Sequence, residues 1–248
     1  MGVCRIKKAV IVGATSGIGK AVAQLLWQKG VDIAIAGRRE NLLADFASSK
    51  GGRVIYAPLD VTAEDAGERL AGLAERLGGA DLILLCSGIG TQNQQLDAEK
   101  ELQTTATNVV GFTRMIDAAF NYFKARGGGH IAAVTSIAGT RGLGAAPAYS
   151  ATKRYQNTYI QSLAQLSNTN GFGIKFTDIR PGFVDTALLN GGSYPLLMKP
   201  DHVAHLIVRA LERQRRTVVV DWRYGIVTAL WRLIPRCIWE RLPIKTKI

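Results

Sequence analysis

The sequence predicts an α/β fold: a doubly wound parallel sheet of about seven strands with helices on both faces, making three layers. Short apolar runs alternate with helix-patterned segments along the chain. The runs are apolar at successive positions, which indicates strands that are covered on both faces. A length of 248 residues with 47% hydrophobic residues suits one domain of this class with a large buried core.

The expected elements alternate in order along the chain. We predict strands over 7–13, 31–37, 53–59, 81–88, 130–136, 173–182 and 217–220. We predict helices over 17–29, 40–49, 64–77, 99–125, 149–167 and 201–213. Right-handed crossovers between parallel strands give a doubly wound sheet. Ligands of such sheets bind beyond the carboxyl ends of the strands, so we expect the ligand site there. No linker, repeat or low-complexity tract interrupts the pattern, so one domain over 1–248 is expected.

Composition limits the partners and the compartment. The scattered cysteines Cys4, Cys86 and Cys237 show no metal spacing, so we expect no metal site and reduced thiols. No apolar run reaches the ~18 residues of a spanning helix, and no signal peptide precedes the first strand, so a cytoplasmic protein is expected. The formal charge of +12 favours an anionic partner: a nucleotide phosphate, nucleic acid or a membrane surface. No recognition motif supports nucleic acid.

A glycine-rich turn follows the first predicted strand. The stretch "VGATSGIG" places Gly13, Gly17 and Gly19 between that strand and the next helix. Glycine permits a tight turn and lets backbone N–H groups approach a pyrophosphate at the helix N-terminus. On the glycines alone, an ordinary strand-to-helix turn stays an open alternative.

The end of the second predicted strand bears on the choice of nucleotide. In the stretch "IAGRRE", Gly37 stands where an acid would hold the ribose 2′-hydroxyl of NAD, and Arg38 and Arg39 follow. A guanidinium suits a 2′-phosphate, which the Ser16 hydroxyl can also reach. The pattern therefore favours NADP over NAD, with two solvated surface arginines as the alternative.

A tyrosine and a lysine share one face of a predicted helix. Tyr149 and Lys153 are four residues apart in "YSATK". An unperturbed phenol has a pKa near ~10, and an adjacent ammonium favours the phenolate and lowers that pKa. Ser136 ends the fifth predicted strand, where its hydroxyl can hold a carbonyl against the phenol. For the pair alone, the alternative is an amphipathic tyrosine beside a surface lysine.

Together these segments resemble the short-chain dehydrogenase/reductase family, in its short single-domain, NADP-preferring branch with a Rossmann-type sheet. The resemblance covers residues 7 to about 190, in family order. Its motifs are "GATSGIG" at 13–19, "LDV" at 59–61, "TNVVG" at 107–111, "VTSIAG" at 134–139, "YSATK" at 149–153 and "RPGFVDT" at 180–186.

The resemblance implies four catalytic residues. Tyr149 would be the general acid in reduction and the base in oxidation. Lys153 would lower the pKa of Tyr149 and bind the nicotinamide ribose. Ser136 would orient the substrate oxygen, and Asn108 would hold a water that links Lys153 to solvent. The family usually forms dimers or tetramers through the helices that hold Asn108 and Tyr149, so a homodimer or homotetramer is implied.

The resemblance also implies NADP(H) as cofactor and a set of residues that bind it. Asp60 and Val61 would lie against the adenine, and Val184 and Thr186 near the nicotinamide carboxamide. The full set is Gly13, Thr15, Ser16, Gly17, Ile18, Gly19, Arg38, Arg39, Asp60, Val61, Ser87, Gly88, Tyr149, Lys153, Pro181, Gly182, Val184 and Thr186.

The chain departs from the family pattern at two places. Val12 replaces the usual threonine, and Cys86-Ser87-Gly88 replaces the usual Asn-Ala-Gly. The first change removes one side-chain hydrogen bond, and the second alters the centre of the sheet and the floor of the cofactor site. We interpret Cys86 as a small buried hydrophobe in preference to a redox thiol.

Two segments are expected to concern the substrate. Residues 187–200 read as an apolar lid, with an ordinary surface loop as the alternative, and the loop 137–148 leads into Tyr149. The tail 223–248 carries six Arg or Lys against one acid, together with two tryptophans. It suits an interfacial segment at an anionic membrane, or a tail that docks on the domain or on another subunit. The stretch "IPRCIWERL" within it faintly resembles family members that reduce a lipid-linked keto-sugar.

We therefore expect NADPH-dependent reduction of an apolar or lipid-like ketone. An NADP-dependent alcohol or sugar dehydrogenase that runs in the oxidative direction is one alternative. A non-catalytic NADP-binding regulator is another, although the intact Asn108, Ser136, Tyr149 and Lys153 argue against it.

Overall fold

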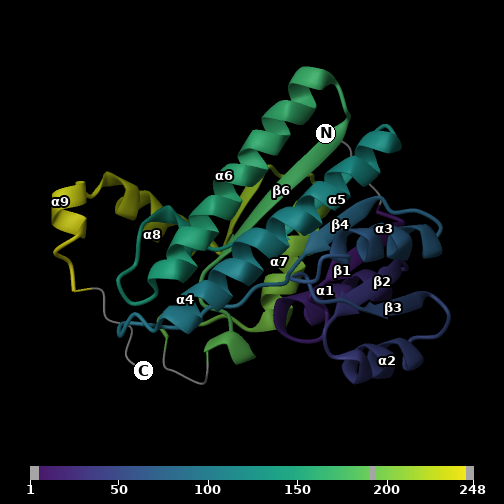
Figure 1. The fold of residues 1–248 in the computed structure, drawn as a ribbon, viewed down its shortest axis with the longest axis horizontal. Helices are drawn as coiled ribbons and strands as arrows, with labels where there is room; N and C mark the ends of the chain where they lie inside the picture. Colours follow the sequence, from purple (N-terminus) through teal and green to yellow (C-terminus); the bar gives the residue numbers. More distant parts are fainter. Residues whose placement is uncertain (1–5, 190–193, 244–248) are drawn as a thin grey trace.

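The computed structural model describes residues 6–189 and 194–243. A parallel sheet of seven strands runs through it in the order β3-β2-β1-β4-β5-β6-β7 (Figure 1). The strands are β1 (Lys8–Val12), β2 (Asp32–Gly37), β3 (Val54–Pro58), β4 (Leu82–Leu85), β5 (Gly129–Val134), β6 (Ile174–Pro181) and β7 (Thr217–Val220). The order reverses between β1 and β4, so the ligand crevice lies beyond their carboxyl ends. The predicted fold class is confirmed.

Helices cover both faces of the sheet (Figure 1). They are α1 (Gly17–Gln28), α2 (Glu40–Ser48), α3 (Ala66–Arg76), α4 (Ala98–Thr105), α5 (Phe112–Ala125), α6 (Pro147–Asn170), α7 (Pro200–Glu212), α8 (Trp222–Leu233) and α9 (Arg236–Trp239). Side chains of α1, α2 and α7 pack with the sheet in one buried cluster, and those of α3, α5 and α6 in a second. In the described ranges, none of these helices has the length and apolar character needed to cross a bilayer.

The helix predicted over 99–125 is divided in the structure. A π-helical segment, η1 (Ala106–Gly111), separates α4 from α5 and carries Asn108. Close packing accompanies it, because a Cβ at Gly111 would lie 2.9 Å from Cγ2 of Val61 and 3.0 Å from its carbonyl oxygen. Such insertions in helices are frequent at functional sites, where they turn a side chain out of the regular helical register.

The tail forms helices α8 and α9, which lie at one end of the molecule, far from α2 and α3 (Figure 1). The Arg141 guanidinium donates hydrogen bonds to three main-chain carbonyls at the end of α8. The Trp239 indole N–H donates to the Gly142 carbonyl at 2.8 Å. The described part of the tail therefore docks on the turn that follows η2 (Ile137–Thr140), which is one of the expected alternatives. The exposed apolar side chains along α8 are Trp222, Ile226, Leu230 and Leu233.

Candidate active site

The predicted site residues follow successive strands at the carboxyl edge of the sheet. The glycine turn follows β1, the paired arginines follow β2, and Asp60 follows β3. Ser87 and Gly88 follow β4, and residues 181–186 begin at the end of β6. Because parallel strands end at one edge, the sheet brings these separate segments to a common crevice.

The turn after β1 requires glycine for close packing. Gly13 has a φ of +86°, and a Cβ there would lie 2.6 Å from the backbone nitrogen of Ser87. A Cβ at Gly19 would lie 2.2 Å from the Gly13 carbonyl oxygen. The start of α1 is thereby held against the end of β4. Ile18, at the start of α1, is half-buried and packs against the core.

Arg39 lies over the glycine turn. Its Nη2 donates to the hydroxyl oxygens of Thr15 and Ser16, each at 2.7 Å. A guanidinium and two hydroxyls thus converge beside the turn, where a nucleotide phosphate would find donors and positive charge. Arg38 is exposed, and its charge lies near Asp60.

Asp60 is held as a carboxylate. The Thr62 backbone N–H, the Thr62 hydroxyl and the Arg38 charge, in that order, keep the pKa of Asp60 below its ordinary value. Val61 beside it is buried. A carboxylate thus stands at the end of β3, where the resemblance implies contact with the adenine.

The segment after β6 returns to the glycine turn. A Cβ at Gly17 would lie 3.0 Å from the Thr186 methyl carbon, so these two segments touch. Gly182 packs on the Tyr224 ring, and the buried Val184 pairs with Met198. The residues that the resemblance assigns to the nicotinamide therefore lie next to those that it assigns to the pyrophosphate. Both sets fit a dinucleotide.

Tyr149 and Ser136 meet at the start of α6. Ser136 follows β5 and caps η2, and its hydroxyl oxygen accepts from the Ala138 N–H at 3.0 Å. Gly90 faces the Tyr149 ring so closely that a Cβ there would lie 2.2 Å from Cδ2. Burial raises the pKa of the Tyr149 phenol, and hydrogen bonding to the Ser136 side chain partly lowers it. The phenol is therefore protonated at neutral pH and can donate a proton.

Lys153 is buried beneath this tyrosine. Its Nζ donates to Oε1 of Gln156 at 3.0 Å and to the Val134 carbonyl at 3.3 Å, and it lies 5.6 Å from the centre of the Tyr149 ring. We expected the ammonium to lower the pKa of Tyr149, but it lies over the ring face, and burial of the phenol is the larger effect. Burial lowers the pKa of Lys153 to about 8, against the opposing charge of Asp178.

Gln156 is a site residue that the sequence prediction missed. Asn108 is fully buried, and its side-chain amide forms hydrogen bonds with both backbone groups of Ile89. The Asn108 main-chain carbonyl accepts from Nε2 of Gln156 at 2.9 Å, while Oε1 of Gln156 accepts from Lys153. Gln156 therefore joins Asn108 to Lys153 directly. The sequence feature that could have indicated Gln156 is its polar side chain three positions after Lys153, on the same face of the predicted helix.

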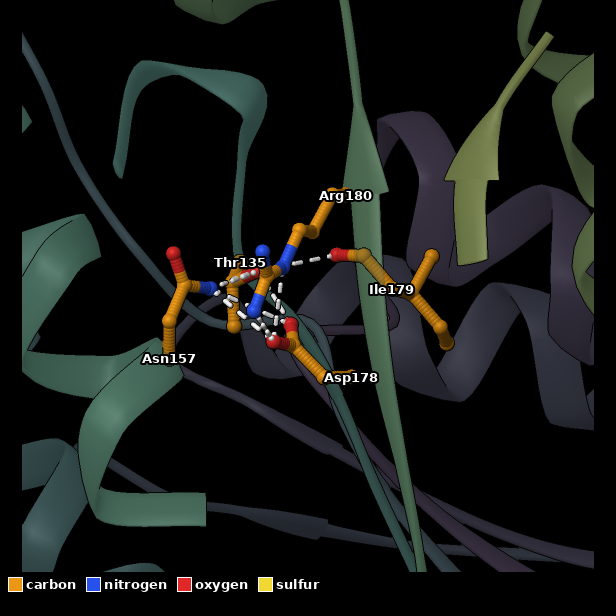
Figure 2. Close-up of polar contacts among 5 residues, drawn as sticks. All are labelled: Thr135, Asn157, Asp178, Ile179 and Arg180. Atoms are coloured by element: carbon orange, nitrogen blue, oxygen red, sulfur yellow. Dashed lines mark hydrogen bonds and ion pairs between the residues drawn. The ribbon is translucent and has the colours of Figure 1, made fainter. Parts of the chain in front are cut away.

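A second missed feature is a buried polar cluster around Asp178 (Figure 2). Oδ1 of Asp178 accepts from the Thr135 hydroxyl at 2.6 Å, and both carboxylate oxygens accept from the Asn157 amide. Oδ2 also accepts from Nε of Arg180 at 2.8 Å. The cluster lies behind Lys153, whose pKa it influences. Its signal was an aspartate in the middle of the predicted strand "IKFTDIRP", between Thr177 and Ile179.

Part of the expected lid can be placed. Residues 190–193 of the segment 187–200 lie outside the described residues. The Met198 N–H donates to the Phe183 carbonyl at 3.0 Å, and the Phe183 and Tyr194 rings lie 4.7 Å apart. Leu188, Leu196 and Leu197 are exposed. Apolar side chains thus gather beside the segment assigned to the nicotinamide.

Cys86 is a partly buried residue that packs against the core. Burial raises the pKa of its thiol to about 12, even though the Lys153 charge opposes this rise. The thiol therefore stays protonated at neutral pH, which favours the structural interpretation of Cys86 over the redox one.

The chain is similar to known oxidoreductases over most of its length. A family model described as short chain dehydrogenase matches residues 7–193. An uncharacterized oxidoreductase of Myxococcus xanthus is 32% identical over 242 residues, which are 94% of this chain and 95% of the relative. An uncharacterized oxidoreductase of Listeria monocytogenes is 32% identical over 244 residues, covering 91% of this chain and 98% of the relative.

Solved structures share the fold. An alcohol dehydrogenase from the archaeon Thermococcus sibiricus, complexed with 5-hydroxy-NADP, is 27% identical with a TM-score of 0.76, covering 86% of this chain and 95% of that chain. A short chain dehydrogenase/reductase from Burkholderia phymatum in complex with NAD has a TM-score of 0.86 at 20% identity and covers 99% of both chains.

Proposed function

The chain belongs to the short-chain dehydrogenase/reductase family of oxidoreductases, and we propose that it reduces a ketone to an alcohol with NADPH. The observation that carries this proposal is the Tyr149 phenol at the start of α6, placed beside the Ser136 hydroxyl at the carboxyl edge of the sheet. A nicotinamide cofactor, when bound, supplies the hydride. The residues of the chain then have to bind the carbonyl, donate a proton to its oxygen and exclude water.

Each catalytic residue has one task in this proposal. The Ser136 hydroxyl and the Tyr149 phenol would both donate to the substrate oxygen, which fixes the carbonyl for attack. Tyr149 would transfer its proton as negative charge develops on that oxygen. The Lys153 ammonium lies close enough to stabilise the phenolate that remains. Gln156 and Asn108 hold Lys153 in position.

The same residues can also run the reaction in the oxidative direction, and one similar solved structure is that of an alcohol dehydrogenase, from Thermococcus sibiricus. Oxidation needs Tyr149 as a phenolate base at the start of the reaction. Because burial raises the pKa of this phenol, the protonated form predominates at neutral pH. The resting enzyme is therefore ready to donate this proton in reduction, whereas the rate of oxidation is expected to rise with pH.

Arg39 supports the preference for NADPH over NADH. Its guanidinium is held by Thr15 and Ser16 beside the glycine turn, where it would face a phosphate on the adenine ribose. Gly37 leaves no carboxylate there to accept from a ribose hydroxyl, and a Cβ at this position would lie 2.9 Å from the Thr15 methyl carbon.

We expect Arg39→Gln to weaken NADPH binding by roughly 10–100-fold and to change NADH binding little, because a charge-assisted contact to phosphate is lost. Fluorescence titration of wild type and variant with both cofactors measures this. Arg76→Gln, at an exposed arginine on α3, is the matched control. Wild-type protein that binds NADH as tightly as NADPH would overturn the cofactor preference. Turnover of a panel of ketones with either cofactor tests the reaction separately.

The substrate class that we propose is an apolar or lipid-like ketone. The described lid segment carries exposed leucines, and its Tyr194 ring lies against Phe183, next to the residues assigned to the nicotinamide. Apolar side chains on a cover of this kind lose water when a hydrophobic substrate binds. Within the panel, kcat/KM is expected to rise with the length of the alkyl chain. The resemblance of the tail to reductases of lipid-linked keto-sugars stays a prediction.

Gln156→Met is expected to shift the pH dependence of reduction. Lys153 is an ammonium below its pKa of about 8 and loses its charge as the pH rises. The Gln156 carbonyl oxygen stabilises the ammonium, so its removal lowers the pKa further. The alkaline fall in kcat/KM should move to lower pH by about one unit. Gln165→Met, at an exposed position of the same helix, should leave the profile unchanged. A destabilised Gln156→Met variant with an unaltered profile would mean that Gln156 only supports the fold.

A further inference from the structure

Four arginines from distant parts of the sequence line one surface groove of about 450 Å³. Arg141 comes from the turn after η2, Arg154 from α6, Arg180 from the end of β6 and Arg232 from α8. Thr158 and Gln161 add hydroxyl and amide groups to the lining. The groove contains none of the residues assigned to the reaction or to the cofactor.

The positive charge in this groove is largely uncompensated. Only Arg180 has an ion-pair partner within residues 6–189 and 194–243, namely the buried Asp178 behind it. No carboxylate is among the groove's lining residues in that part of the chain. Arg141, Arg154 and Arg232 thus bring three positive charges to one groove without an ion-pair partner in the described residues, and the binding of an anion would relieve their mutual repulsion.

One of these guanidinium groups is held in place before any ligand arrives. Arg141 donates to the carbonyls of Trp231 at 3.2 Å, Arg232 at 3.0 Å and Ile234 at 2.6 Å. These carbonyls lie at the C-terminal end of α8. The hydrogen bonds therefore fix the Arg141 side chain relative to the backbone of Arg232. Less side-chain freedom is lost when a ligand binds to a positioned arginine than to a free one.

From these observations we propose that the groove binds an oxyanion of the phosphate type. Guanidinium groups present N–H donors in a planar fork that matches two oxygens of a phosphate. The groove has the size of a small-molecule site and exceeds a bare phosphate ion, so the ligand is a phosphate carried on a larger group. A phosphorylated metabolite and the headgroup of an anionic lipid share this chemistry. The exposed apolar row on the neighbouring α8 would contact acyl chains in the second case.

The test compares three proteins by titration with inorganic phosphate at constant ionic strength, balanced with chloride. They are the wild type, the double variant Arg154→Gln/Arg232→Gln, and the control Arg209→Gln/Arg213→Gln. Both pairs are exposed, and both variants lose two positive charges, but the control pair lies outside the groove, with Arg209 on α7 and Arg213 directly after it. Phosphate that binds at the cofactor turn contributes equally to all three, so the difference between the variants isolates the groove.

We expect the phosphate Kd of the groove variant to rise roughly tenfold or more, while the control stays near wild type. Cosedimentation with vesicles of phosphatidylglycerol and phosphatidylcholine in equal parts identifies the source. Vesicle binding that the groove variant loses and free phosphate inhibits would assign a lipid headgroup. Phosphate binding without vesicle binding would assign a soluble phosphorylated ligand. Equal phosphate affinity in the two double variants would overturn the proposal, whether or not ketone reduction is observed.

Discussion

Tyr149→Phe is expected to lower kcat/KM for ketone reduction by roughly 10²–10⁴-fold, the usual contribution of a positioned general acid. Phenylalanine keeps the ring that packs against Gly90 and removes only the hydroxyl. The buried substrate oxygen then loses both its proton donor and one hydrogen bond. NADPH affinity should change by less than about twofold, because a neutral hydroxyl contributes little to binding a polyanionic cofactor. Single-turnover absorbance of NADPH measures the chemical step directly.

Tyr155→Phe is the control for this change. It removes a phenol from the same helix, where the Tyr155 hydroxyl contacts the Thr113 hydroxyl at 2.7 Å and not Ser136. Its turnover should stay near wild type. If Tyr149→Phe kept wild-type turnover, another group would have to supply the proton, and the assignment of Tyr149 as general acid would be wrong.

The sequence predicted where the candidate site residues lie in the fold better than it predicted their contacts. Motif spacing placed Tyr149 and Lys153 on one helix face, and the end of a strand placed Ser136 at the crevice. Nothing in the spacing could tell that the Lys153 ammonium bonds to Gln156, because that depends on side-chain conformations in a buried helix. The strength of burial was equally hidden, and burial decides the direction in which the pKa of Tyr149 moves.

The fold could be predicted because it depends on which segments are buried. Hydrophobic patterning reports which segments are buried, and seven apolar runs separated by helices leave few arrangements of a parallel sheet. The same patterning reads 99–125 as one helix, since a π-helical insertion at 106–111 changes the backbone without changing which residues are apolar. The sequence left docking of the tail on the domain as one alternative, and it could not choose among them because Arg141 lies about 90 residues from the carbonyls that it binds.

The buried aspartate behind the site should control both stability and reactivity. We expect Asp178→Asn to lower the free energy of unfolding by about 3–5 kcal/mol, the range for breaking a buried ion pair from one side. The carboxylate accepts hydrogen bonds from Thr135, Asn157 and Arg180 at once (Figure 2). An amide of the same shape turns one acceptor into a donor, and Arg180 stays largely buried without its counter-charge. Urea unfolding followed by circular dichroism measures the loss.

Asp45→Asn is the matched control, because it removes the same charge from an exposed position on α2 and should cost little. A loss below about 1 kcal/mol for Asp178→Asn would mean that the cluster is no more important than a surface contact.

The Asp178→Asn protein that remains folded is also expected to show a changed pH dependence of reduction. The Asp178 charge raises the pKa of Lys153, so its removal lets burial lower that pKa below about 8. The alkaline fall in reduction should then begin at lower pH, as in Gln156→Met. Both variants would thus lower the pKa of Lys153, a shift that a purely structural role for either residue would not produce.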